Sequence, residues 1–546
     1  MCRNDISYLS LATLLIFLIP CPAQQRASWT AEPQTLAARF HDAVDGGVEI
    51  LTDDEAPPIL VRTRSGLVQG VVEGGLRAFR GIPYAAPPLG NLRWRPPVPP
   101  LRWENVRDAS SFGNACIQIN SAGKLVGSED CLVLNVYTAA SGRVRGQPVV
   151  VFLHGGGNRR GSTQGAPFDA PPLAMHGVIV VTAEYRLAAL GFFAHPLLVA
   201  ESGSAGNYGL MDQIAALRWV RGNIQAFGGD PERVMVFGQS AGGYDVQALL
   251  ASPLALGLFS RAGIESNAIP LGQLGNLAGS EAGAAALVTR LGCDGAADVL
   301  ACLRVVSAEV VVSNQRGLPF GTIIEPRVLP ADPFAVLQQK GSPVPLLIGS
   351  NREEWTVLGD DPTVPLDENG YTTAIHARFD PYGAGVADQV LLLYPTSEYD
   401  MPDYALVDVD SDFGITCEVR NVALAAARTH ESSIWRYLFI HRFENDPSLN
   451  VLRAFHTAEL YFVFGNLQEV ASRPYTPSVT EIELSNHLMD YWASFAANGN
   501  PNGPHQVYWP PYDGKRDRIL ELDETTKRLV SYHAAQCDYL STLPQP

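Results

Sequence analysis

A single serine, Ser240, lies between glycines in the sequence GQSAGG, directly after a short apolar run. A serine oxygen attacks a carbonyl only when a base removes its proton and nearby donors stabilise the oxyanion that forms. A G-x-S-x-G sequence between a strand and a helix is typical of a nucleophile elbow, because the small flanking residues permit an unfavourable backbone conformation at the serine. A tight turn between packed elements is the alternative interpretation. If Ser240 is a nucleophile, the chain must also supply hydrogen-bond donors for the oxyanion, a base that removes the serine proton, and an acid that orients the base.

Donors for an oxyanion are expected in the sequence HGGG, residues 154–157, which follows the apolar run 148–153. Three consecutive glycines allow the main chain to approach a substrate oxygen, and this pattern matches the glycine-rich element of lipases and esterases. A plain glycine loop is the alternative. The occurrence of this element together with the elbow favours the catalytic interpretation of both.

The base and its acid are less well defined by pattern. Elbow enzymes place their residues in the order serine, acid, histidine, which excludes every histidine before Ser240. Seven follow it, and pattern alone does not choose among them: His376, His430, His441, His456, His487, His505 and His533. Glu353 and Glu354 come just after the apolar run 345–350, at a strand end where α/β sites are built. A solvated acidic pair is the alternative there.

The elements that must position these groups are short β-branched runs that alternate with helical patterns. Runs 148–154, 177–186, 233–238 and 345–350 predict strands, and residues 210–227 have apolar side chains at helical spacing. This alternation predicts an α/β fold whose large, mostly parallel central sheet has helices on both faces. Because no glycine- or serine-rich linker interrupts the region, we expect one domain over residues 58–546, preceded by a leader over residues 24–57.

The first 23 residues have the layout of a signal peptide. An arginine precedes an apolar run from Leu9 to Ile19, and small residues end the segment at Ala23. That run is short for a membrane span, so we expect cleavage near Ala23 and a secreted or periplasmic protein. An anchor that stays uncleaved is the alternative. After the signal peptide no other apolar run has the length of a membrane span.

Composition narrows the possible partners. Hydrophobic residues make up 46% of the chain and charged residues 17%, which predicts a globular protein with a large core. The formal net charge of −17 leaves no basic surface for phosphates, so nucleic acid is not expected as a partner. The sequence DVDSDFG, Asp408 to Gly414, imitates a calcium loop, but Val419 stands where that loop has its final glutamate. We therefore expect an acidic surface loop there, and neither metal nor cofactor.

Six cysteines follow the signal peptide, and an exported chain meets an oxidising compartment in which disulfides form. Six cysteines allow 15 pairings, so spacing alone does not fix the connectivity. Two short-loop pairs would leave a third, long-range pair: Cys116 with Cys131, Cys293 with Cys302, and Cys417 with Cys537. Unpaired buried thiols are the alternative, and no spacing is typical of a zinc site.

A set of longer segments resembles the type B carboxylesterase/cholinesterase family in the order expected. The segments are FRGIPYAAPPLGNLRWRPP, SEDCLVLNVY, HGGG, EYRLAALGFF, GNYGLMDQIAALRWVRGNIQAFGGDPERVMVFGQSAGG, HTAELYFVFG and YWASFAANGNPNG. The resemblance implies an α/β-hydrolase fold and a triad of Ser240, Glu354 and His456. It further implies oxyanion donors at Gly156, Gly157 and Ala241, the same three disulfides, an ion pair of Arg93 with Glu129, and a supporting polar role for Ser266.

Three departures from the family pattern bear on the substrate. Gln239 and Trp355 stand where the family usually has glutamate and glycine, and no tryptophan lies between Cys116 and Cys131. A quaternary ammonium group needs an aromatic face, so choline esters are disfavoured, and the short loop disfavours an interfacial lipase. We expect a serine esterase that hydrolyses small neutral esters through an acyl-enzyme. A lipase, a cholinesterase or a non-catalytic binding protein are the alternatives, and the oligomeric state is open.

Overall fold

The structure is a computed structural model, and it describes residues 59–141, 145–359, 365–429 and 433–544. The expected signal peptide and leader lie outside these residues. None of the described helices is both long and apolar enough to cross a membrane.

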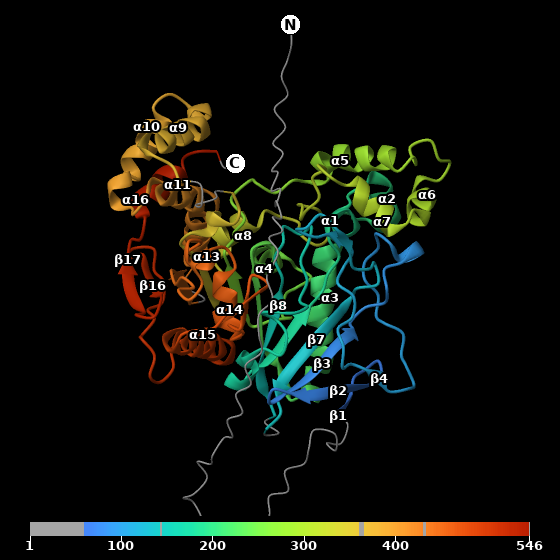
Figure 1. The fold of residues 1–546 in the computed structure, drawn as a ribbon. Helices are drawn as coiled ribbons and strands as arrows, with labels where there is room; N and C mark the ends of the chain where they lie inside the picture. Colours follow the sequence, from blue (N-terminus) through green and yellow to red (C-terminus); the bar gives the residue numbers. More distant parts are fainter. Residues whose placement is uncertain (1–58, 142–144, 360–364, 430–432, 545–546) are drawn as a thin grey trace, which may run out of the picture. The chain divides into compact units, whose positions relative to one another are not determined.

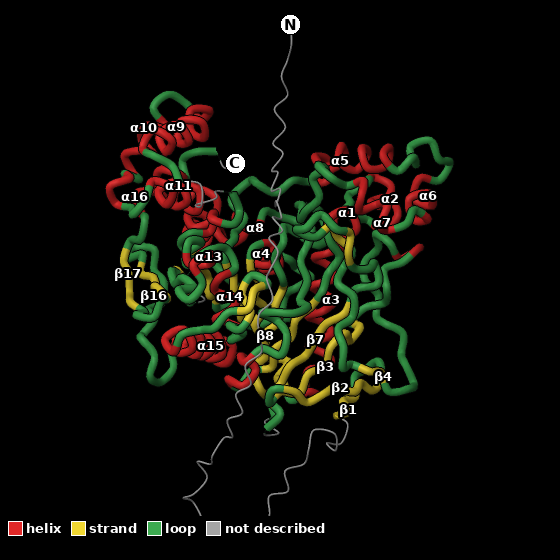
Figure 2. Tube along the Cα trace, in the orientation of Figure 1, coloured by secondary structure: helices red, strands yellow, loops and turns green. Residues whose placement is uncertain are grey.

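One mixed sheet of 13 strands organises the described chain (Figures 1 and 2). Its middle strands, from β9 through β8, β10, β11, β12 and β13 to β16, are parallel to one another, whereas β7 and β17 pair antiparallel with β9 and β16. In spatial order the strands are β1 (Ile59–Arg62), β2 (Leu67–Glu73), β3 (Leu76–Pro83), β7 (Val133–Ala139), β9 (Ile179–Ala183), β8 (Gln147–Leu153), β10 (Gly229–Gln239), β11 (Arg261–Glu265), β12 (Leu346–Asn351), β13 (Ile434–Phe439), β16 (Arg518–Leu522) and β17 (Lys527–Val530), with β4 (Arg107–Asp108) beside β2. Two small sheets pair β5 (Gln118–Ile119) with β6 (Leu125–Val126) and β14 (Glu469–Val470) with β15 (Arg473–Pro474).

The middle strands are largely apolar because both of their faces are covered. Along β8, Val149 and Val151 belong to one core cluster, whereas Val150 and Phe152 belong to a second cluster on the opposite face. Alternate side chains of a strand point to opposite faces, so a strand buried on both sides is mostly apolar along its length. This explains why the predicted strands are unbroken runs of β-branched and aromatic residues.

Helices cover both faces of the sheet. Helices α3, α4, α8 and α12 contribute to the first core cluster, and α14 and α15 to the second. The helices are α1 (Ala188–Phe192), α2 (Pro196–Ser202), α3 (Tyr208–Asn223), α4 (Ala241–Ala251), α5 (Leu277–Arg290), α6 (Val299–Val305), α7 (Ala308–Asn314), α8 (Pro333–Lys340), α9 (Glu368–Phe379), α10 (Val386–Leu393), α11 (Pro402–Ser411), α12 (Cys417–Ala426), α13 (Pro447–Asn450), α14 (Ala458–Phe464), α15 (Val479–Asn498) and α16 (Ala534–Leu540). The fold class expected from the sequence is confirmed, and the helix predicted at 210–227 is α3 followed by one 3-10 turn.

A third, smaller core lies among α9, α10, α11 and α16, the group of helices at the left of Figure 1. The Cys417–Cys537 disulfide belongs to it and joins α12 to α16. The other two pairs considered from the sequence, Cys116–Cys131 and Cys293–Cys302, are also joined as disulfides in the structure.

The expectation of an acidic surface loop at residues 408–414 is wrong. Asp408 lies in α11, and Asp412 begins a single π-helical turn that runs to Thr416. Both carboxylates are buried, and each has a partner: Asp408 lies 3.3 Å from Arg352, and Asp412 lies 2.6 Å from His533. Asp412 also lies near Cys417 and Cys537, but both of those sulfur atoms are already joined in the disulfide. The alternating acids are therefore part of a helix core, stabilised by cations.

Candidate active site

Ser240 lies at a sharp turn between β10 and α4. Its backbone has φ 56° and ψ −125°, a conformation that L-residues rarely adopt, and its N–H donates to Glu265 O at 2.8 Å. The flanking glycines allow this turn to pack closely, since a Cβ on Gly242 would collide with the carbonyl of Leu153. The structure thus shows the strained elbow that the sequence predicted, with Ser240 at the amino-terminal end of a helix.

The glycine turn after β8 lies against this elbow. A Cβ built on Gly155 would lie only 2.9 Å from Ser240 Cβ, and Gly156 and Gly157 have φ values of 107° and 65° that favour glycine. Within the described chain the backbone N–H groups of Gly156, Gly157 and Ala241 donate to no protein acceptor. Three free N–H groups beside one serine oxygen form a donor set suited to an oxyanion.

Two polar side chains hold this glycine turn in place. Gln118, in β5, donates to Gly161 O and accepts from Gly161 N, both at 2.7 Å. Glu184 accepts from the N–H and the hydroxyl of Thr163 at 2.7 and 2.9 Å. Gln118 lies inside the loop closed by Cys116 and Cys131, so that loop supports the donors.

His456 and Glu354 meet although 102 residues separate them in the chain. The Nδ1 of His456 lies 2.6 Å from Glu354 Oε2, and the other oxygen of Glu354 accepts from Asn351 N at 2.8 Å. Glu354 is fully buried in the turn that follows β12, and His456 precedes α14. A carboxylate fixed on Nδ1 leaves Nε2 as the nitrogen that can accept a proton.

The Ser240 hydroxyl makes no hydrogen bond within the described chain. Instead, the side-chain amide of Gln239 lies 3.4 Å from His456 Nε2. The residue next to the serine therefore touches the histidine, while the Ser240–His456 hydrogen bond expected of a triad is not formed in this state. Such bonds are often long without substrate and tighten when it binds.

Electrostatics favour proton uptake by His456. Burial acts to lower its pKa, but the adjacent Glu354 carboxylate outweighs burial and Glu459 adds to the effect, so the pKa of His456 is raised above 6.5. A histidine with a raised pKa is a better base once it is neutral, and its cation is stabilised by the same carboxylate.

A second layer of buried polar groups lies behind the histidine, and sequence patterns did not reveal most of it. Asn351 donates to the carboxylate of Glu459 and to Phe455 O, the latter at 2.7 Å, so it ties the end of β12 to the histidine loop. Ser266, which the resemblance marked as a supporting residue, donates to Glu459 Oε1 at 3.3 Å. Glu459 was visible in the motif HTAE, three residues after His456, but its role needed the fold.

Two carboxyl groups in this layer have raised pKa values. Burial and the nearby Glu354 charge raise the pKa of Glu459 to about 7. Burial, helped by Glu459, raises the pKa of Glu265 well above its usual range, and Glu265 accepts from Trp492 Nε1 at 2.7 Å. A neutral Glu265 avoids placing a further buried charge next to Glu459.

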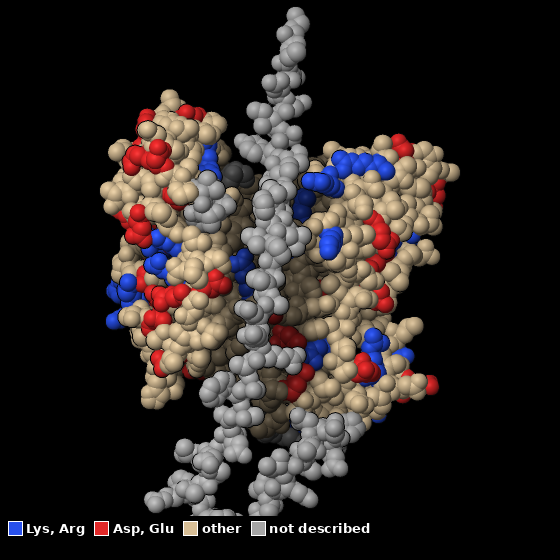
Figure 3. Space-filling model, viewed as in Figure 1, with Lys and Arg blue, Asp and Glu red and all other residues tan. Residues whose placement is uncertain are grey.

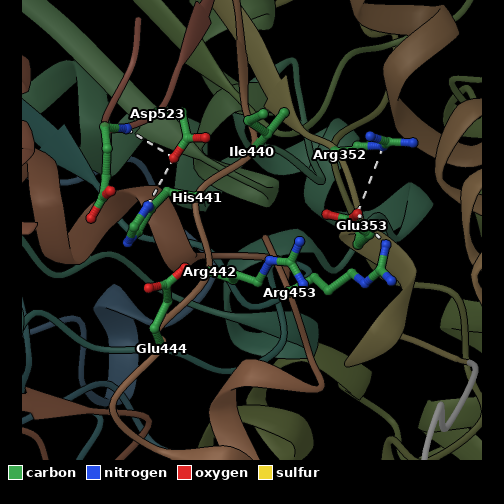
Figure 4. Close-up of a pocket in the computed structure, with 9 residues that line it drawn as sticks. Arg352, Glu353, Ile440, His441, Arg442, Glu444, Arg453 and Asp523 are labelled. Atoms are coloured by element: carbon green, nitrogen blue, oxygen red, sulfur yellow. Dashed lines mark hydrogen bonds and ion pairs between the residues drawn. The ribbon is translucent and has the colours of Figure 1, made fainter. Parts of the chain in front are cut away.

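Glu353 points away from His456, into a separate polar cavity of about 180 Å³ (Figure 4). It accepts from Ala454 N at 3.2 Å and lies 3.7 Å from both Arg352 and Arg453. Burial raises its pKa to about 7, and Asp408 adds to the rise. The two adjacent glutamates therefore face different environments, and only Glu354 contacts the histidine.

The structure also explains the tryptophan that departs from the family pattern. The Trp355 ring packs against Gly359 and Gly414, and a Cβ on either glycine would collide with it. Gly414 lies in the π-helical turn of residues 412–416, so that turn makes room for the larger side chain. The expected ion pair of Arg93 with Glu129 is present as a two-pronged contact at 2.6 and 2.7 Å.

Comparison with known proteins supports this architecture. The model of the carboxylesterase family matches residues 57–540. The chain is 36% identical to a fumonisin B1 esterase of Sphingopyxis macrogoltabida over 491 residues, 86% of this chain and 87% of that one. It is also 36% identical to a para-nitrobenzyl esterase of Bacillus subtilis strain 168 over 489 residues, 85% and 94% of the two chains.

A solved structure of a PNB esterase has the same fold. It superposes with a TM-score of 0.73 at 32% sequence identity, and the match covers 88% of this chain and 99% of the other.

Proposed function

The chain belongs to the carboxylesterase family, and on that premise we propose that it is an exported serine esterase in which Ser240, His456 and Glu354 form the triad. His456 Nε2 removes the Ser240 proton while Oγ attacks the ester carbonyl. The N–H groups of Gly156, Gly157 and Ala241 stabilise the oxyanion. His456 then protonates the leaving alcohol, and water activated by the same nitrogen releases the acid from Ser240.

The observation that carries this proposal is the buried contact of His456 with Glu354 next to the elbow. It fixes one nitrogen of the imidazole on a carboxylate and leaves the other beside residue 239.

Covalent capture of Ser240 tests the proposal directly. An aryl dialkyl phosphate, diethyl para-nitrophenyl phosphate, should lose one para-nitrophenolate per chain as Ser240 Oγ forms the new bond to phosphorus. We expect mass spectrometry to place one diethylphosphoryl group on the peptide that contains Ser240, with loss of esterase activity in proportion. The Ser240→Ala variant should release no burst and retain its folded circular dichroism spectrum.

A matched control is Ser313→Ala, which removes an exposed hydroxyl on α7. This variant should react like the unaltered enzyme. Stoichiometric labelling of a residue other than Ser240, or turnover by Ser240→Ala near the normal rate, would refute the assignment of the nucleophile.

Neutral esters are proposed as substrates in preference to cationic ones. Gln239 brings an uncharged amide to the histidine, and no tryptophan lies in the Cys116–Cys131 loop. Butyrylcholine should therefore be hydrolysed with a kcat/KM no higher than that of its neutral analogue, 3,3-dimethylbutyl butyrate. A preference of about tenfold for the cation would correspond to about 1.4 kcal/mol and would favour a cholinesterase instead.

Export is proposed from the signal-like sequence at residues 1–23 and is supported by the three disulfides. Expression with an epitope tag at the carboxyl end, followed by fractionation, tests it. We expect the tagged protein outside the cytoplasm, with a new amino terminus near Gln24. Recovery of the full-length chain from the cytoplasm would contradict export.

A further inference from the structure

The turn that carries the proposed oxyanion donors continues directly into two arginines, Arg159 and Arg160. Their backbone N–H groups both donate to Gly156 O at 3.1 Å, so the two residues belong to the same tight turn. Both are exposed. Two flexible cations thus begin within one turn of the groups proposed to hold the substrate carbonyl.

Neither guanidinium has a carboxylate partner in the part of the chain that the structure describes. Arg159 donates one N–H to Leu318 O at 3.0 Å, which orients the group and leaves its other donors available. The chain has a formal net charge of −17, so an unpaired basic pair beside the site is a local reversal of the overall charge. On the face drawn in Figure 3, basic side chains gather near the left end of α5.

A cavity of about 320 Å³ opens beside Arg159. Its walls are Arg159, the first turn of α5 and the segment 319–323, with Ser280, Phe320 and Thr322 among the lining residues. The amino-terminal end of α5 adds the partial positive charge of a helix dipole. A cavity of this size holds a short chain with a terminal polar group, well below the size of a lipid.

This cavity is joined to the catalytic region through Asp245, one turn after Ser240 in α4. Asp245 Oδ1 accepts from Asn158 Nδ2 at 3.0 Å and from Thr322 Oγ1 at 3.1 Å. Asn158 directly follows the donor glycines, and Thr322 lines the cavity. The cavity therefore borders the oxyanion turn, whereas the contacts of His456 run to Glu354 and Gln239 on other elements.

We propose that Arg159, supported by Arg160, binds a carboxylate carried by the acyl part of the ester, so that half-esters of dicarboxylic acids are preferred substrates. His456 protonates the leaving alcohol, so the alcohol part of the ester must lie on the side of His456. The acyl part then lies on the other side of the carbonyl carbon, toward the turn that carries Gly156 and Gly157. Arginine matches a carboxylate with two parallel hydrogen bonds. The inference rests on the proposed serine esterase function and orders substrates as anionic, then neutral, then cationic.

The test compares two substrates that differ only in charge. One is the mono-para-nitrophenyl ester of adipic acid, and the other is the same ester with its free carboxylate replaced by a carboxamide. For the unaltered enzyme we expect kcat/KM to favour the carboxylate by about tenfold. Arg159→Gln should bring the ratio close to one by lowering only the rate with the carboxylate, and Arg160→Gln should reduce the ratio less.

Arg218→Gln is the matched control. Like Arg159, Arg218 is exposed, donates one N–H to a backbone carbonyl, that of Leu254 at 3.4 Å, and has no ion pair within the described residues. It lies on α3, away from the cavity, and its removal should leave the ratio unchanged. Raising the salt concentration from about 0.05 M to about 0.5 M should lower the ratio for the unaltered enzyme and have no effect on the carboxamide.

A ratio near one in an enzyme that turns over both esters would overturn the anionic subsite and leave the serine esterase function standing. An equal loss with both esters in Arg159→Gln would show that Arg159 supports the turn and does not select the substrate. Absence of turnover with either ester, under conditions in which Ser240 is also not phosphorylated, would instead refute the proposed function itself.

Discussion

Two buried histidines, His456 and His441, have opposite surroundings. His456 has one nitrogen on Glu354 at 2.6 Å and the other beside the neutral amide of Gln239. His441 has carboxylates on both nitrogens, Asp523 at 2.9 Å and Glu481 at 3.4 Å. His441 lines the polar cavity into which Glu353 points (Figure 4).

The different number of carboxylate contacts makes His456 suited to act as a base and makes His441 a structural cation. Burial acts to lower the pKa of His441, but Asp523 and Glu481 outweigh it and raise the pKa to about 9, so His441 keeps its proton at neutral pH. A general base must have a free nitrogen and a pKa close to the working pH. His456 meets the first condition through its uncharged neighbour Gln239, and His441 meets neither.

Exchange of each histidine for glutamine should give the largest contrast. His456→Gln removes the proposed base, and we expect kcat to fall by about 10⁴–10⁶-fold with little change in stability. His441→Gln should keep kcat within a few-fold. Steady-state rates with para-nitrophenyl butyrate and thermal melts of both variants measure this. Comparable losses of kcat in the two folded variants would remove the distinction.

The adjacent glutamates give the next contrast. Glu354→Gln loses the charge that orients and stabilises the His456 cation, and we expect kcat to fall by about 10³–10⁴-fold. Glu353→Gln changes only the polar cavity that Glu353 lines, and it should lower kcat by less than about tenfold. Both rates should be measured on protein shown to be folded. If Glu353→Gln were the more damaging change, the acid would be misassigned by one residue.

Stability should depend on pH through His441. Its pKa is about 9 in the folded chain and ordinarily 6.5, so the stabilisation is fully present below pH 6.5 and is lost as the pH rises through 9. This rise in the pKa of His441 on folding corresponds to roughly 3 kcal/mol in the free energy of unfolding. Melting temperatures from pH 6 to 10 should fall more steeply for the unaltered protein than for His441→Gln. Parallel curves would show that His441 is not the cation that this geometry indicates.

A charge at residue 239 should make the surroundings of His456 more like those of His441. Gln239→Glu would place a carboxylate near Nε2 and raise the pKa of His456 by about one unit. The rising limb of kcat/KM against pH should move upward by the same amount, and the preference for neutral over cationic esters should shrink by a few-fold. An unchanged pH profile of kcat/KM would mean that the charge of residue 239 does not affect the pKa of His456.

The sheet and the elbow were predictable because they depend on local pattern. Unbroken apolar runs such as 148–153 and 234–238 favour a strand covered on both faces, and the glycines around Ser240 favour a close turn. These features depend on spacing over a few residues. The fold class could therefore be predicted before any contact was known.

The partners of the histidines were not predictable from pattern, because they are set by contacts between distant segments. Nothing in the residues around His456 or His441 states that one meets a single carboxylate and the other meets two. The resemblance to a family pointed to His456, and pattern alone did not. Asp408 and Asp412 were misplaced on the surface for the same reason, since their cationic partners come from other parts of the chain.

The paired hydrogen bonds between Gln118 and Gly161 limit how this protein can be engineered or diversified. Gln118 belongs to the loop closed by Cys116 and Cys131, so a variant that replaces that loop to widen the entrance also removes the support of the oxyanion turn. Libraries that randomise the loop should therefore hold Gln118 fixed. Insertions that lengthen the loop are better placed at its exposed tip, residues 121–124, where neither the disulfide nor the Gln118–Gly161 hydrogen bonds are disturbed.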